Sequence, residues 1–247
     1  MNQWFENDTF WERFAPIMFD EARWAGSKWE AQGVLKLSAT GPSSAILDSC
    51  CGVGRHVVEF AKLGHKVTGI DRTRSYIEAA RELVNAEGLD VELLTGDVRS
   101  FIRPEEFQLA VNMFTSFGFF ENLNEERIYI DNIYKSLSKG GSFVIDVNGK
   151  ELLARDFTES EAWEKDGFLI FTEYSIEDSW NTLKNRWMII DQDGERFEYV
   201  FSHRIYSANE LSSLLIESGF ESVEVFGGFD GKPYNDKAER LIVCAKK

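Results

Sequence analysis

The sequence predicts an α/β fold: a doubly wound, mostly parallel seven-stranded sheet with an inserted antiparallel β meander. Between residues 45 and 150, short apolar segments alternate with helical patterns. The apolar segments lack a polar face, which is typical of parallel strands covered by helices on both sides. Near residue 150 the alternation stops and longer strand-like segments begin. A helical pattern and two more apolar segments follow residue 207.

Residues 1–40 are predicted to form an N-terminal helical cap. Four of the seven tryptophans lie in this segment, and Phe10, Phe14 and Met18 recur at helical spacing. An aromatic stripe at this spacing usually packs against a core. The same stripe could instead cover a binding site, and both interpretations stay open.

The first part of the α/β core is expected over residues 41–150. Its first two strands each end at an aspartate, and glycines follow the helical patterns, as is common at helix C-termini. We expect Lys139-Gly140-Gly141 to close the third helix. The expected strands are 45–47, 66–70, 91–94, 107–113 and 142–147, and the expected helices are 57–63, 73–87 and 124–138.

The segment 151–206 is predicted to be an inserted antiparallel β element that serves as a lid or as a dimer contact. Asp193-Gly194 is a hairpin turn signal between its last two strands. The three strands are expected at 168–175, 183–191 and 196–206.

Residues 207–247 are expected to return to the core and complete its sheet. Ser207 and Glu210 have the spacing of a capping box ahead of a helix. The last two strands are expected at 221–226 and 241–245.

The charge balance excludes several classes of partner. Lys and Arg total 27 against 42 Asp and Glu, a formal charge of -15. Phosphate backbones and anionic membrane surfaces repel such a chain, so we expect no nucleic acid and no membrane partner. The three cysteines show no pairing pattern, and the N-terminus lacks the features of a secretory signal. A cytoplasmic location with reduced thiols is therefore expected.

The first strand–turn–helix unit carries the strongest chemical signal. Gly52 and Gly54 allow a ligand to approach the backbone closely, and the helix that follows offers free N–H groups. Asp71 ends the second strand, 23 residues after Asp48, where a carboxylate can accept hydrogen bonds from ribose hydroxyls. These residues predict a nucleoside-containing ligand at the carboxyl ends of the strands.

Two common nucleotide motifs do not fit this turn. The third glycine of a dinucleotide fingerprint is absent, as is the Gly-Lys-Ser/Thr of a P-loop. Asp48 would repel a pyrophosphate, whereas it suits a ligand with a cation, such as an ammonium or a sulfonium. A nicotinamide-dependent oxidoreductase is thus an alternative that these residues disfavour.

The turn and four further segments resemble motifs of class I S-adenosylmethionine-dependent methyltransferases, in particular a bacterial subgroup that acts on small molecules. The matching segments are 46–56 (ILDSCCGVGRH), 67–71, 96–99, 107–118 and 139–146. The resemblance is strong over residues 45–150 and looser over 207–246. It implies a Rossmann-like fold and S-adenosylmethionine as the methyl donor. Cys50 departs from the pattern, because the family usually has glycine there.

The resemblance also implies a role for each motif. The methionine part of the cofactor would face Asp48, Cys51, Gly52, Val53 and Gly54. The nucleoside would contact Asp71 through its ribose hydroxyls and Arg72, Asp97 and Val98 through its adenine. The sulfonium side would be lined by Asn112, Met113 and Phe114.

The predicted function is methyl transfer by in-line displacement to a nitrogen or oxygen of a small-molecule acceptor. Candidate proton acceptors are His203, Tyr206, Asp146 and, more weakly, Glu173. The histidines show no metal-ligand spacing, so no metal is expected. A binding module without catalysis remains an alternative, and a homodimer formed through exposed strand edges is a further expectation.

Overall fold

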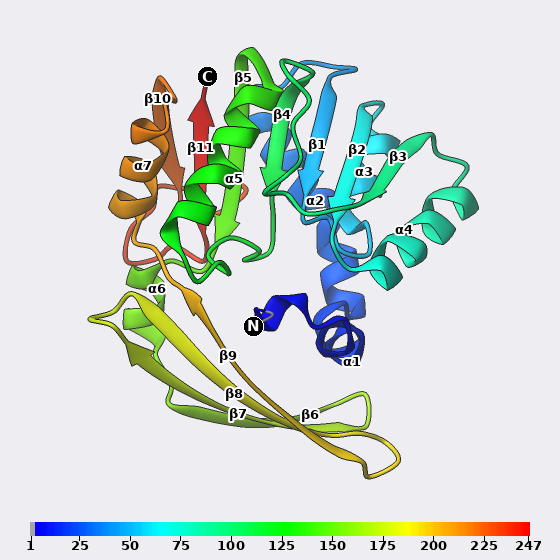
Figure 1. Ribbon diagram of the computed structural model, residues 1–247, viewed down its shortest axis with the longest axis vertical. Coiled ribbons are helices and arrows are strands. Elements are labelled where there is room, and N and C mark those ends of the chain that lie inside the picture. Colours follow the sequence, from blue (N-terminus) through cyan, green and yellow to red (C-terminus); the bar gives the residue numbers. More distant parts are fainter. Residues whose placement is uncertain (1–2) are drawn as a thin grey trace.

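Two separate sheets organise the computed structural model, which describes residues 3–247 (Figure 1). The larger sheet has seven strands in the order β10-β11-β5-β4-β1-β2-β3, and β11 alone runs antiparallel to its neighbours. The smaller sheet is antiparallel, in the order β6-β7-β8-β9. This architecture confirms the predicted fold class.

The larger sheet is built from short strands joined by helices. Its strands are β1 (Ala45–Ser49), β2 (Lys66–Asp71), β3 (Val91–Thr95), β4 (Phe107–Asn112), β5 (Leu137–Val147), β10 (Ser222–Phe226) and β11 (Leu241–Lys246). The helices are α1 (Asp8–Met18), α2 (Glu21–Leu37), α3 (Arg55–Lys62), α4 (Arg74–Ala86), α5 (Leu123–Ser136), α6 (Lys150–Asp156) and α7 (Ala208–Glu217), preceded by the short 3-10 helix η1 (Trp4–Glu6).

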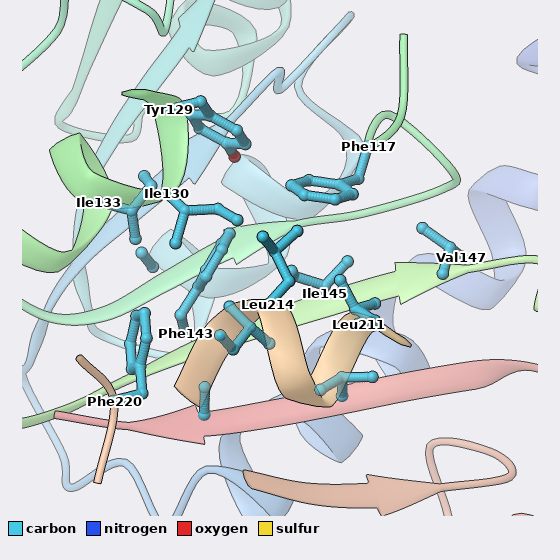
Figure 2. Packing of buried hydrophobic residues seen from close by; sticks show 14 of the residues in the cluster. Phe117, Tyr129, Ile130, Ile133, Phe143, Ile145, Val147, Leu211, Leu214 and Phe220 are labelled. Carbon is cyan, nitrogen blue, oxygen red and sulfur yellow. The ribbon is translucent and has the colours of Figure 1, made fainter. Parts of the chain in front are cut away.

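Alternate residues of the central strands point to opposite faces of the larger sheet, where they belong to two buried clusters. Phe143 and Ile145 of β5 pack under α5 and α7, as Figure 2 shows, whereas Val144 points to the cluster formed with α2, α3 and α4. This period of two is the side-chain geometry of a strand. Both faces are therefore apolar, which is why the strands read as nearly continuous hydrophobic runs.

The smaller sheet covers the N-terminal helix rather than the larger sheet. Its strands are β6 (Ser160–Lys165), β7 (Phe168–Glu177), β8 (Thr182–Ile190) and β9 (Arg196–Arg204). Phe10, Phe14 and Ile17 of α1 are buried against Ile170 and Ile189 of this sheet. In Figure 1 α1 lies between the smaller sheet and the carboxyl ends of β1 and β2.

The structure corrects three details of the sequence prediction. The smaller sheet has a fourth strand, β6, whose SEAWEK sequence lacks an apolar period. The Asp20 carboxylate accepts the backbone N–H of Arg23 and so caps the start of α2. The N-terminal helical pattern is therefore divided into two helices, α1 and α2. The third core helix ends at Ser136, and the glycines expected to close it lie inside β5.

Two backbone contacts join the smaller sheet to the larger one. The N–H of Arg204, at the end of β9, donates to the carbonyl of Gly118 at 2.8 Å. The N–H of Lys150 donates to the carbonyl of Tyr206 at 2.9 Å. The first of these bonds holds the loop after β4 to the end of β9, where the chain returns from the smaller sheet to the core. Within residues 3–247, no helix is long and apolar enough to cross a membrane.

Gly118→Ala should weaken this junction. Gly118 has φ 101°, and a Cβ there would lie 2.4 Å from the Arg204 carbonyl oxygen. We expect the free energy of unfolding to fall by about 3 kcal/mol or more, because strain and a backbone clash add. Gly140→Ala is the matched control. Gly140 has φ 75°, but a Cβ there would meet open space. Its substitution should therefore lower the free energy of unfolding by only about 1–2 kcal/mol. Equal losses in urea denaturation would contradict the role of the contact.

Candidate active site

The turn after β1 folds back over the end of β2. The N–H groups of Cys50 and Cys51 both donate to the carbonyl of Ile70, at 2.8 and 3.0 Å. Gly52 and Gly54 have φ of 56° and 83°, and Cys50 has φ of 64°. This left-handed region favours glycine, which gives a physical reason for the glycine that the family usually has at the position of Cys50. In this chain a cysteine adopts that unfavourable backbone conformation.

Asp71 joins two turns through its carboxylate. Oδ2 accepts the N–H of Gly52 and Oδ1 accepts the N–H of Thr73, both at 2.9 Å. Burial raises the pKa of Asp71, while these two backbone donors oppose the rise. A carboxylate has about four acceptor positions, so each oxygen keeps capacity for one more donor. Two neighbouring hydroxyls of a ribose match that capacity.

Asp48 lines the cavity with a buried carboxyl group. The residue is 1% exposed, and its Oδ2 has no hydrogen-bond partner within the described chain. Burial raises the pKa of Asp48 to about 7, the nearby Asp71 adds to the rise, and His56 and Arg55 oppose it. A buried oxygen of this kind is costly unless a donor binds it. A ligand ammonium would supply that donor.

A charged cluster ties α2 to the start of α3 beside Asp48. Arg55 is buried and donates through Nη1 to the Arg23 carbonyl at 2.5 Å and to Ser27 Oγ at 2.7 Å. His56 Nε2 lies 2.7 Å from Glu30 Oε2. Arg55 and His56 both line the cavity. Neither residue was predicted to contact the cofactor, although both directly follow the glycine turn.

Asp97 lies in the cavity wall with its carboxylate held by Arg99. The Arg99 side chain bonds both oxygens, through Nε at 3.0 Å and Nη2 at 2.5 Å, and its N–H donates to Oδ1 at 2.8 Å. Arg99 also pairs with Glu6 and Glu125. It thus links η1 and α5 to this loop. An adenine amino group at Asp97 would share the carboxylate with Arg99.

These walls enclose a cavity of about 170 Å³. Nine of the residues predicted to contact the cofactor line it: Asp48, Cys51, Gly52, Asp71, Arg72, Asp97, Val98, Met113 and Phe114. Cys50 lines it too, and three predicted residues are not part of the described lining: Val53, Gly54 and Asn112. Asn112 is fully buried and donates to Tyr129 Oη at 3.1 Å.

The remaining wall is mainly aromatic and comes from the N-terminal segment, α4 and the loop after β4. Its aromatic members are Phe5, Trp11, Phe19, Tyr76, Phe119 and Phe120, and Met18 and Ser116 also belong to it. Trp11 Nε1 donates to the Phe5 carbonyl at 2.7 Å, and Tyr76 Oη donates to the Trp11 carbonyl at 2.6 Å. The polar ends of these rings are therefore engaged within the protein. Within the described chain, β6 to β9 contribute no residue to the lining.

The candidate proton acceptors do not meet in this cavity. His203 packs beside Phe119, and burial lowers its pKa to about 4. Tyr206 Oη donates to the buried carboxylate of Glu126. Asp146 accepts from Arg240 at 2.7 Å, and Glu173 pairs with Arg186 on the surface of the smaller sheet. None of the four candidates lines the described cavity.

A thiol nucleophile built on Cys51 does not fit these surroundings. Burial raises the pKa of the Cys51 thiol well above its usual value, and nearby Asp48 and Asp71 raise it further. A thiol of this kind stays protonated and unreactive. Among residues 3–247, no group of three or more His, Cys, Asp or Glu side chains is placed to hold a metal ion.

Comparisons with known proteins relate the chain to methyltransferases. Residues 46–141 match the model of a methyltransferase domain family. A Geobacillus sp. protein named as a methyltransferase is 22% identical over 231 residues, which cover 89% of this chain and 92% of that protein. Glycine/sarcosine N-methyltransferase of Aphanothece halophytica is 22% identical over 233 residues, 90% of this chain and 83% of that enzyme.

Solved structures share the fold along nearly the whole chain. An S-adenosylmethionine-dependent methyltransferase from Clostridium acetobutylicum aligns with a TM-score of 0.77 at 16% identity, covering 96% of each chain. The S-adenosylmethionine-bound amino pentose methyltransferase CalS10 from Micromonospora echinaspora aligns with a TM-score of 0.68 at 20% identity, covering 92% of this chain and 94% of that one. With the matched domain model and the five motifs, the chain is a class I S-adenosylmethionine-dependent methyltransferase.

Proposed function

We propose that this methyltransferase transfers the methyl group to the nitrogen of a small-molecule amine. The observation that carries the proposal is the aromatic wall, whose polar ends are engaged within the protein. S-adenosylmethionine, when bound, supplies a methyl group already activated on a sulfonium. The protein's own task is then to bind, align and exclude water.

The residues around the β1 turn fit the cofactor. The unpartnered Asp48 oxygen suits the ammonium of its amino-acid part, and the spare acceptor capacity of Asp71 suits its ribose hydroxyls. Asp97 and Val98 lie in the wall where the adenine would follow. A nicotinamide dinucleotide suits this site less well, because its pyrophosphate would face the Asp48 carboxylate.

The acceptor is expected against the aromatic wall. Trp11, Phe119 and Phe120 line the cavity there, and Trp11 Nε1 already donates to the Phe5 carbonyl. Ring faces attract cations, so the wall suits an amine that gains positive charge as its nitrogen is methylated. Ser116 also lines the cavity, but its Oγ donates its proton to the Met113 carbonyl at 3.0 Å and has no further proton to donate to an alcohol.

The lack of a free base among the four candidates also favours nitrogen over oxygen. A neutral amine attacks with its own lone pair and releases its proton after transfer. A hydroxyl needs a positioned base during the attack. His203 has a pKa of about 4 and packs outside the lining, and Asp146 is held by Arg240. His56 does line the cavity, but it is bonded to Glu30 and lies beside Asp48, at the end assigned to the cofactor.

The names of several similar proteins support an amine acceptor. Besides the glycine/sarcosine N-methyltransferase, KedS8 from Streptoalloteichus sp. is a sugar N-methyltransferase, and its structure aligns with a TM-score of 0.70 at 17% identity.

Three expectations from the sequence stay predictions: the division of the chain into cap, core and insertion, the homodimer, and the cytoplasmic location. The free cysteines Cys50, Cys51 and Cys244 are compatible with a reducing compartment.

Asp71→Ala should abolish tight cofactor binding. The change removes the acceptor for the Gly52 and Thr73 amides as well as the proposed partner of the ribose. We expect the Kd for S-adenosylmethionine, measured by calorimetry, to rise about 100-fold or more. Asp90→Ala, at an exposed position, should leave it unchanged. An unchanged Kd in Asp71→Ala would refute the site assignment.

Cofactor affinity should rise with pH through the titration of Asp48. Its pKa of about 7 leaves the carboxyl mostly neutral at pH 6 and mostly ionised at pH 8. Because an ammonium binds the ionised form, we expect affinity to increase about tenfold over this interval. Asp48→Asn should bind more weakly at pH 8 and lose this pH dependence. The same slope in the variant would show that another group is responsible.

Amines and alcohols that share one carbon skeleton test the acceptor atom. We expect release of S-adenosylhomocysteine with at least one small amine and none above background with its matched alcohol. The rate should fall as the pH drops below the pKa of the amine, because protonation removes the lone pair. His203→Gln should change the rate by less than about threefold, since the residue is expected to be no base. Faster transfer to the alcohol would exclude the amine proposal.

A further inference from the structure

The turn after β4 holds two successive residues in a backbone conformation that side chains rarely adopt. Phe114 has φ 60° and Thr115 has φ 59°. This region is unfavourable for residues with a Cβ and especially for a β-branched residue such as threonine. Such strain persists where surrounding contacts enforce it. The ring of Phe114 lines the cavity, so this backbone conformation decides where the ring stands.

One aspartate and one arginine satisfy the polar groups of this turn. Asp146 accepts the N–H of Phe114 through Oδ2 at 3.0 Å and the N–H of Thr115 through its carbonyl at 2.9 Å. Arg240 donates from Nε to Asp146 Oδ1 at 2.7 Å and from Nη2 to Thr115 Oγ1 at 3.2 Å. Arg240 lies just before β11 and is not among the described lining residues.

Two further guanidinium groups face the ring of Phe114. The Cζ atom of Arg23 lies 4.4 Å from the ring centroid and that of Arg55 lies 5.3 Å from it. Both distances are within the range of cation–π contacts. The Phe114 ring thus contacts two cations, while the backbone of Phe114 is held by Asp146, which in turn is held by Arg240.

We propose that Arg240 is a positioning residue of the methyl-transfer site, which holds Phe114 in the cavity wall by acting through Asp146 and Thr115. The consequence for methyl transfer rests on the proposed function, whereas the effect on the turn does not. The same arrangement gives Asp146 a task other than proton transfer. Its two carboxylate oxygens serve the Phe114 amide and the Arg240 guanidinium.

Arg240→Lys tests this inference while keeping a positive charge beside Asp146. A lysine ammonium lacks the planar fork that reaches two acceptors on different residues. We expect the amide hydrogen exchange of Phe114 and Thr115, followed by nuclear magnetic resonance, to quicken about tenfold. We expect the Kd for S-adenosylhomocysteine to rise by about tenfold, as for the loss of one hydrogen bond. The Tm should stay within about 3 °C of the parent.

Arg155→Lys is the matched control, because Arg155 holds the same loop before β11. It donates to the carbonyls of Asp236 and Ala238, at 2.7 and 3.0 Å, and does not contact Asp146. It should leave exchange at Phe114 and the Kd unchanged. An equal effect of Arg155→Lys would reduce Arg240 to a general loop anchor and overturn the proposal.

Thr115→Val supplies an independent arm. It removes the hydroxyl that Arg240 contacts and should quicken the same amides, and combining it with Arg240→Lys should add little. Fully additive effects, or unchanged exchange at Phe114 in Arg240→Lys, would refute the inference. No acceptor is present in these measurements, so a failure of the amine proposal would leave their result intact.

Discussion

The carboxylate of Asp71 is the contact on which the cofactor side of the molecule depends. Its two oxygens join the turn after β1 to the turn after β2 through the amides of Gly52 and Thr73. Both turns meet there because parallel strands end at one edge of their sheet. The strained backbone of Cys50 is held at the same place by the carbonyl of Ile70. The Asp71 carboxylate, which would bind the ribose, therefore also fixes the turn after β1 that would contact the rest of the cofactor.

The N-terminal helix α1 explains why the chain carries a second sheet. One side of α1 buries Phe10, Phe14 and Ile17 against that sheet, while Trp11 and Met18 line the cavity. Of the aromatic stripe, Phe10 and Phe14 thus pack against the smaller sheet, whereas Met18 lies in the cavity wall. Trp11 and Met18 are seven residues apart, a spacing that places them on one side of the helix. The smaller sheet shapes the cavity indirectly, through the helix it supports.

The features that could be predicted from the sequence are those with a local signal. Asp48 and Asp71 follow recognisable strands, and glycines mark the turn between them. Strand β6 has no apolar period and exists because the backbone of β7 pairs with it, so no pattern predicted it. Glu30 and Arg240 lie far along the chain from the residues they contact, His56 and Asp146. Tertiary structure alone brings such pairs together, and the same holds for the Tyr206–Glu126 contact that removes Tyr206 from the candidate bases.

The position of α1 between two sheets has a consequence for biosynthesis. Its Phe10 and Phe14 side chains rest on Ile170 and Ile189, and Trp4 of the preceding η1 donates from Nε1 to the carbonyl of Ser202. A ribosome adds residues in order at about 5–20 per second, so these partners emerge many seconds after the helix that needs them. Helix α1 is therefore synthesised well before the strands on which it docks. Phe10 and Phe14 lack these partners during that interval, so the segment exposes apolar surface of the kind that chaperones bind.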